Sequence, residues 1–182
     1  MNEELEVLKI VTKRLDENNI SYMVTGSVAM NFYAMPRMTR DIDIVLEISE
    51  KDAPRLMEMF CEDFYINQEM IINAVRSQGM FNIIHNDYVI KIDFIVRKDN
   101  PYRKTEFQRR RKVKVDSVWI WLVTVEDLIL SKLWWAKQSR SERQFEDIKN
   151  ILSQVKDIDK KYLEKWVRNL GIYTLYEELS DE

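Results

Sequence analysis

Two aspartates separated by one residue, Asp41 and Asp43, begin a segment that alternates acidic and apolar side chains. On a strand, alternate side chains point to the same face, so the two carboxylates project together about 6.6 Å apart while Ile42 and Ile44 turn to the core. A third carboxylate, Asp93, alternates with apolar neighbours in a later segment of the same kind. If the two strands are neighbours, all three acids converge.

Carboxylates gathered at one point repel one another unless a cation lies between them. A hard divalent ion, Mg²⁺ or alternatively Mn²⁺, prefers oxygen ligands and commonly bridges to phosphates. The three acids therefore predict phosphoryl transfer with two metal ions, one lowering the pKa of an attacking hydroxyl and the other neutralising a triphosphate. Asp93 is the candidate that helps to deprotonate the acceptor.

A Gly-Ser pair, Gly26 and Ser27, supplies the other half of such a site. Glycine allows the backbone to approach a phosphate, the serine hydroxyl can donate to it, and a helix that begins there favours anions. Arg37 and Arg40, just before the first aspartate, can also reach phosphate oxygens.

The elements that must position these residues follow from hydrophobic periodicity. We expect strands at 22–25, 41–48, 80–85, 88–96, 113–115 and 118–122, with an Asn-Asp turn in the hairpin at 80–96. Helices are expected at 3–18, 28–33, 49–62, 124–137, 141–155 and 159–171, with Ser141 and Gln144 forming a capping box.

Few forced breaks are expected, because the 182 residues include only three Gly and three Pro. The fold class is therefore α/β (α+β), a small mixed β-sheet with flanking helices and a C-terminal helical part. We expect a catalytic domain at 1–123 and a helical subdomain at 124–182.

The composition excludes several classes of protein. A net charge of -3 argues against a surface that is basic throughout and binds nucleic acid everywhere. The single cysteine, Cys61, cannot form an intrachain disulfide, and its apolar surroundings predict a core thiol. The acidic start is no secretory signal and the longest apolar run, 118–125, is too short to span a bilayer, so we expect a cytoplasmic protein without a membrane partner.

Two features have open interpretations. The basic run 103–114 either binds an RNA backbone or a second protein, or forms a solvated hairpin face. The tryptophans are either stacking surfaces for bases or core residues, and we expect at least one of each pair in the core; the pairs are Trp119 with Trp121 and Trp134 with Trp135.

The Gly-Ser pair, the spacer at 28–40, the Asp-Ile-Asp-Ile segment and the later strand aspartate resemble the DNA polymerase β-like nucleotidyltransferase superfamily over residues 20–97. This resemblance implies that Asp41, Asp43 and Asp93 bind metal and that Gly26 and Ser27 hold the triphosphate of an NTP such as ATP.

The segments 124–133 and 144–148, with Arg140 between them, look like the helical part of AbiEii-type toxins and related minimal nucleotidyltransferases. In such proteins a helix lysine, here Lys132, points at the nucleotide and Asp147 supports the site. From the residues alone, a lysine whose stem lies along the domain seam is as good an interpretation of Lys132.

The expected activity is transfer of a nucleoside monophosphate from an NTP to an RNA, a protein or a small molecule, with a toxin-antitoxin system as one setting. The rival from another class is an inactive nucleotide-binding or protein-interaction module. A second rival is hydrolysis by the same metals.

Overall fold

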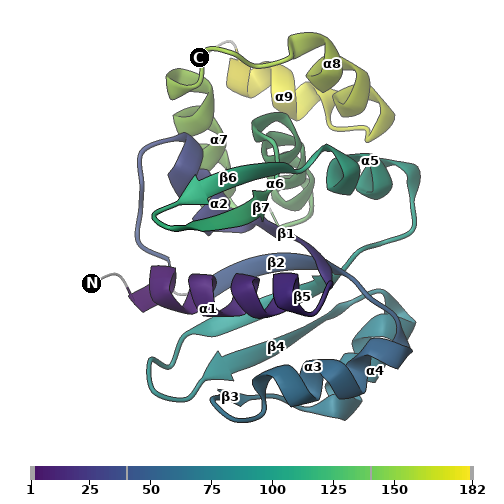
Figure 1. Ribbon diagram of the computed structural model, residues 1–182. Coiled ribbons are helices and arrows are strands. Elements are labelled where there is room, and N and C mark those ends of the chain that lie inside the picture. Colours follow the sequence, from purple (N-terminus) through teal and green to yellow (C-terminus); the bar gives the residue numbers. More distant parts are fainter. Residues whose placement is uncertain (1–2, 40, 140, 181–182) are drawn as a thin grey trace.

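The computed structural model describes residues 3–39, 41–139 and 141–180, and in this part of the chain helices pack against a seven-stranded sheet (Figure 1). The strands are β1 (Ser21–Thr25), β2 (Asp41–Glu47), β3 (Phe64–Tyr65), β4 (Met80–His85), β5 (Lys91–Val96), β6 (Arg111–Val115) and β7 (Val118–Leu122).

The order of the strands across the sheet is β3-β4-β5-β2-β1-β7-β6. Strand β2 runs antiparallel to β1 but parallel to β5, and β1 runs parallel to β7. Two antiparallel hairpins, β4–β5 and β6–β7, complete the sheet. The sheet is therefore mixed, as the expected fold class requires, and that fold class is confirmed.

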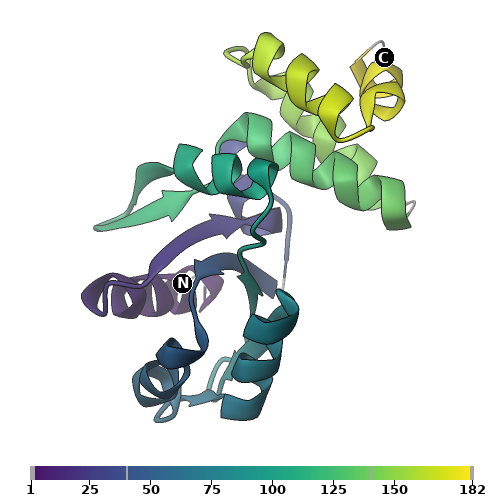
Figure 2. The same ribbon diagram turned by 90° about the vertical axis from the view of Figure 1, so that its right-hand side faces the viewer.

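Helices cover both faces of the sheet. Helix α1 lies in front of the sheet in Figure 1, whereas α2 and α6 lie behind β6 and β7, and α7, α8 and α9 gather beyond α6 (Figure 2). The helices are α1 (Glu3–Glu17), α2 (Gly26–Tyr33), α3 (Ala53–Phe60), α4 (Gln68–Ser77), α5 (Pro101–Arg109), α6 (Val125–Ser139), α7 (Glu142–Gln154), α8 (Lys160–Asn169) and α9 (Tyr173–Ser180), with a 3-10 turn η1 (Glu50–Asp52) before α3.

The apolar face of the central strands forms the middle of the core. Ile42, Ile44 and Leu46 on β2 are fully buried, and so are Ile92 and Phe94 on β5. The intervening residues of both strands point to the opposite face, as alternation predicts. Hydrophobic burial on one face of the sheet thus directs the acidic side chains to the other.

Several local expectations were wrong. Helices α4 and α5 were not predicted, and the basic run begins in α5 instead of a hairpin. Cys61 is exposed at the C-terminal cap of α3 and is no core thiol. Ser141 does cap α7 by position, but its side chain makes no capping hydrogen bond, and the Gln144 side chain contacts Lys132.

Helix α6 follows the last strand directly and contacts α2, which belongs to the first half of the chain. A domain boundary near residue 124 stays a prediction. Across the described residues, every helix is too short or too polar to cross a bilayer.

Candidate active site

The three aspartates lie on the two central strands of the sheet. The parallel register of β2 and β5 places Asp43 beside Asp93, and Asp41 beside Lys91. On the other side of β2, Asp43 pairs with Thr25, the residue before the Gly26-Ser27 turn. The adjacency on which convergence depends is therefore present, and Asp43 lies between the third acid and the Gly-Ser turn.

The charged groups around Asp43 change its pKa. Burial, and then the neighbouring carboxylates of Asp93 and Asp41, raise the pKa of Asp43 from 3.8 to about 6. The ammonium groups of Lys132 and Lys91 oppose this rise. A buried acid with a raised pKa beside two like charges indicates a site with excess negative charge, into which a cation fits.

Lys91 was missed from the sequence. Its Nζ lies 2.8 Å from Asp93 Oδ2 and 3.6 Å from Asp41 Oδ1. The side-chain hydrogen bond to Asp93 contributes most to the raised pKa of this lysine. The signal that was present is its position two residues before Asp93, which puts both side chains on one face of β5.

Gly26 packs directly against the side chain of Asp43 and has a backbone conformation that favours glycine. Its φ is +66°, in the left-handed region that favours glycine, and a Cβ added there would lie 2.7 Å from Asp43 Cγ. The absence of a side chain thus lets the carboxylate pack against the turn. Helix α2 begins at the same residue and Thr25 gives it no side-chain cap, so no capping side chain occupies the N–H groups of the first turn.

Arg37 lies beside the Gly-Ser turn, with its guanidinium already engaged. Its Nη2 donates to Ser27 Oγ at 2.6 Å, and Nε and Nη2 each donate to a different oxygen of Asp147 at 2.8 Å. The contact of Arg37 with phosphate stays a prediction, and these contacts hold its guanidinium next to Ser27. Arg40, the other arginine expected at phosphate, lies outside the described residues, as does Arg140.

Lys132 is buried on α6 and is held by α7. Its Nζ donates to Asp147 Oδ2 at 2.7 Å and to Gln144 Oε1 at 3.1 Å. Burial lowers the pKa of Lys132, and the hydrogen bond to Asp147 partly offsets this. Asp147 therefore joins Lys132 to Arg37, and through Arg37 to Ser27.

A cavity of about 510 Å³ is lined by part of this site, whereas Asp41, Asp93 and Arg37 are not among its lining residues. The Gly-Ser turn, Asp43 and Lys132 line it together, although they come from segments far apart in the sequence. The opposite wall, which was not predicted, is formed by the α4–β4 turn at Ser77, Gln78, Gly79 and Met80, with Ile95 and Lys98; Thr25, Leu128, Ser131, Trp135 and Gln144 complete the lining.

The donor chemistry of the acids fits a divalent metal ion, because all three offer carboxylate oxygens and Asp43 carries uncompensated charge. Their arrangement is not a closed metal cage: no three metal-binding side chains of the described ranges are grouped as a ready-made site. The residues fit the ion by type and charge, and two of them, Asp41 and Asp93, also form ion pairs with Lys91.

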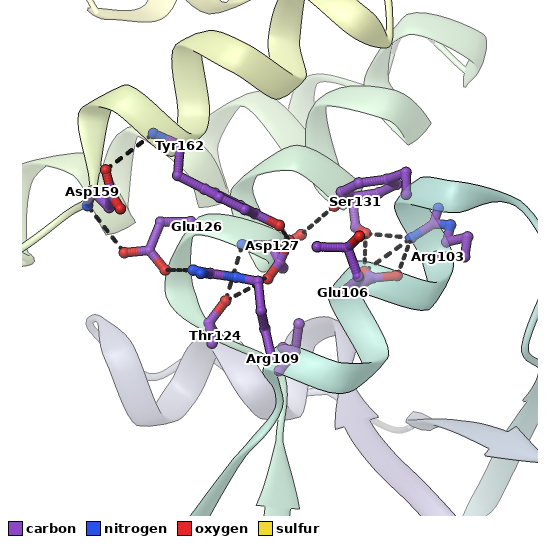
Figure 3. Close-up of polar contacts among 12 residues, drawn as sticks. Arg103, Glu106, Arg109, Thr124, Glu126, Asp127, Ser131, Asp159 and Tyr162 are labelled. Atoms are coloured by element: carbon purple, nitrogen blue, oxygen red, sulfur yellow. Dashed lines mark hydrogen bonds and ion pairs between the residues drawn. The ribbon is translucent and has the colours of Figure 1, made fainter.

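The basic run is partly internal (Figure 3). Arg103 donates to both oxygens of buried Glu106 at 2.9 and 2.7 Å and to Ser131 Oγ at 2.7 Å. Arg109 likewise pairs with Asp127 at 3.0 Å. These two arginines hold α5 to α6 and are not available to a partner, so the expectation of a basic surface along 103–114 is wrong for them.

No model of a known protein family matches the sequence, and no curated protein sequence matches it. Solved structures do match. An antigenic nucleotidyltransferase-like protein from Paracoccidioides brasiliensis is 19% identical with a TM-score of 0.58, covering 84% of this chain and 75% of that one.

Two further structures have the same fold. A putative nucleotidyltransferase from Thermotoga maritima is 18% identical with a TM-score of 0.55, over 78% of this chain and 89% of that one. The lincosamide antibiotic adenylyltransferase LnuA, solved with lincomycin, is 12% identical with a TM-score of 0.56, over 84% and 97%. The fold that the sequence resemblance implies is thus confirmed, and the chain has the nucleotidyltransferase fold.

Proposed function

We propose that the protein is a metal-dependent nucleotidyltransferase that moves a nucleoside monophosphate from an NTP, such as ATP, to an acceptor hydroxyl. One observation carries the proposal: the register places Asp43 beside Asp93 on one side and next to the Gly26-Ser27 turn on the other. Asp43 lines one cavity together with Gly26 and Ser27, so a carboxylate and a phosphate-binding turn face the same space, which is the pairing that phosphoryl transfer needs.

The triphosphate is assigned to the side of the cavity with the turn. The N–H groups at the start of α2 and the Ser27 hydroxyl are donors for its oxygens. Lys132 adds a buried positive charge on the same wall. Arg37 orients the Ser27 hydroxyl through the hydrogen bond between them, and Asp147 holds both cations in place.

The acceptor is assigned to the side with the acids. Asp41, Asp43 and Asp93 would hold one or two Mg²⁺ or Mn²⁺ ions, which when bound supply charge neutralisation and a lower pKa for the attacking hydroxyl. The hydroxyl oxygen forms a bond to the α-phosphorus as the bond to pyrophosphate breaks. Asp93 accepts the hydroxyl proton, and Lys91 orients its carboxylate.

The acceptor class, whether RNA, protein or small molecule, and a pairing with an antitoxin stay predictions of the sequence resemblance. LnuA is an adenylyltransferase of a lincosamide antibiotic, which makes a small hydroxylated molecule one of the acceptors to test.

Incubation with each of the four NTPs labelled at the α-phosphate, Mg²⁺, and separate pools of RNA, protein and small molecules tests the proposal. The wild type should transfer label to one pool, and Asp43→Asn should not. Asp157→Asn, at an exposed aspartate far from the cavity residues in sequence, should label as the wild type does.

The rival functions give different results. Free nucleotide without a labelled acceptor would indicate hydrolysis by the same residues. Nucleotide binding without either product would indicate the inactive module. Equal labelling by Asp43→Asn and the wild type would refute the assignment of the site.

A further inference from the structure

The β6–β7 hairpin carries a face that the transfer reaction does not use. Cross-strand pairing puts Lys112 beside Trp121 and Lys114 beside Trp119, so these four side chains share one face of the hairpin. The other face is apolar and faces the core: Val115, Ile120 and Leu122 are buried. We call the four residues, together with Arg110 at the start of the hairpin, the hairpin face.

Two cations of the hairpin face, Arg110 and Lys112, lie over the ring of Trp121. Arg110 Cζ lies 4.9 Å and Lys112 Nζ 5.4 Å from the centroid of Trp121. Among the residues that the structure describes, neither lysine of the hairpin face makes an ion pair within 4.0 Å, and the carboxylate that interacts electrostatically with Lys112 is that of Asp16 on α1. Trp119 is 51% exposed, a high value for so large an apolar side chain.

We propose that the hairpin face binds single-stranded nucleic acid. Lysines without an ion-pair partner fit a chain of phosphates, and the exposed indole of Trp119 fits an unpaired base, whose face is free to stack. A duplex would not satisfy this indole, because its bases are stacked on one another. An acidic peptide would pair with the lysines but would bring no ring for Trp119.

Edge strands commonly carry lysines that prevent pairing with another sheet, and β6 is an edge strand. That role needs no aromatic partner, whereas here each of the two lysines faces a tryptophan.

The edge strand β6 is also close to the strand that carries Asp43. Three strand spacings of about 4.8 Å separate β6 from β2, roughly 14 Å. This inference does not depend on the transfer reaction, because binding is measured without an NTP.

Fluorescence anisotropy with a labelled single-stranded RNA of roughly 12 nucleotides, mixed in sequence, tests the proposal at low salt. Trp119→Ala should weaken binding by roughly 5- to 150-fold, the effect of losing one stacked base. Lys112→Ala combined with Lys114→Ala should reduce the slope of log affinity against log salt by about 1.4, since each phosphate contact contributes about 0.7.

Matched control variants are available at the other edge of the sheet. Tyr65→Ala removes a 56% exposed aromatic side chain on β3, and Lys51→Ala removes an exposed lysine in η1. Both should bind the RNA as the wild type does, and circular dichroism should show that all variants are folded.

Four results would overturn the proposal. The first is no binding of the RNA by the folded wild type at low salt. The second is equal losses in the controls and in the hairpin variants. The third is a duplex of the same length binding as tightly as the single strand. The fourth is a competition experiment in which polyglutamate displaces the labelled RNA as well as unlabelled RNA does, at an equal concentration of negative charge. That result would assign the face to acidic proteins.

Discussion

Asp43→Asn should make the protein more stable at neutral pH while abolishing transfer. The pKa of Asp43 is raised from 3.8 to about 6 in the folded protein, so folding penalises its charged form. At 1.36 kcal/mol per pKa unit, this difference corresponds to at most about 3 kcal/mol. The protonated acid contributes its full stability to the fold below pH 3.8, and this stability is lost as the pH rises through about 6. Asparagine keeps its neutral side chain at every pH, so the extra stability of Asp43→Asn should grow across this window and be constant above it.

Urea unfolding of both proteins at intervals from pH 4 to 8 measures this difference. The free energy of unfolding of Asp43→Asn minus that of the wild type should rise by 1–3 kcal/mol over the window, an order-of-magnitude figure. Mg²⁺ should stabilise the wild type more than the variant, because an ion that binds only the folded site adds stability. A constant difference at all pH values would refute the reasoning that burial and repulsion by Asp93 and Asp41 destabilise the charged form.

Three further changes test other parts of the structure. Gly26→Ala should lower the rate of transfer at least 10-fold and reduce the free energy of unfolding in urea by roughly 1–3 kcal/mol. The added Cβ would be strained by the positive φ and would overlap the Asp43 carboxylate, so unchanged kinetics would contradict the close packing. Lys132→Met should raise KM for the NTP by about 10-fold or more in steady-state kinetics, and a wild-type KM would exclude the lysine from the nucleotide site. Arg103→Met should cost about 3–5 kcal/mol of unfolding free energy by leaving Glu106, 3% exposed, as an unpaired buried charge, and a loss below about 1 kcal/mol would show that the pair is not needed.

The candidate site could be predicted where local rules decide the geometry. Alternation along a strand is enough to place Asp41 and Asp43 on one face, and the Gly26-Ser27 turn follows from a glycine between a strand and a helix. Asp93 needed one more fact, that β5 lies beside β2. That pairing joins segments about fifty residues apart, and no local pattern specifies it.

The contacts that no local pattern specifies depend on such distant partners. Arg37 was expected at phosphate, and its contact with Asp147, 110 positions away, is revealed only by the packing of α7. The inward turn of Arg103 depends in the same way on Ser131 of α6, which no spacing within the basic run could indicate. The role of a polar side chain depends on the residues that the fold places next to it. Periodicity therefore predicts which apolar residues are buried better than it predicts the contacts of polar residues.

The double contact of Asp147 also bears on how substrates exchange. One buried carboxylate holds Arg37, from the segment between α2 and β2, and Lys132, from α6. Widening the seam between these elements would leave a buried Asp147 carboxylate or a buried Lys132 ammonium without its partner. The wall that carries Ser27 and Lys132 is therefore expected to move as one unit. Nucleotide and product are then expected to enter and leave without separation of these two elements.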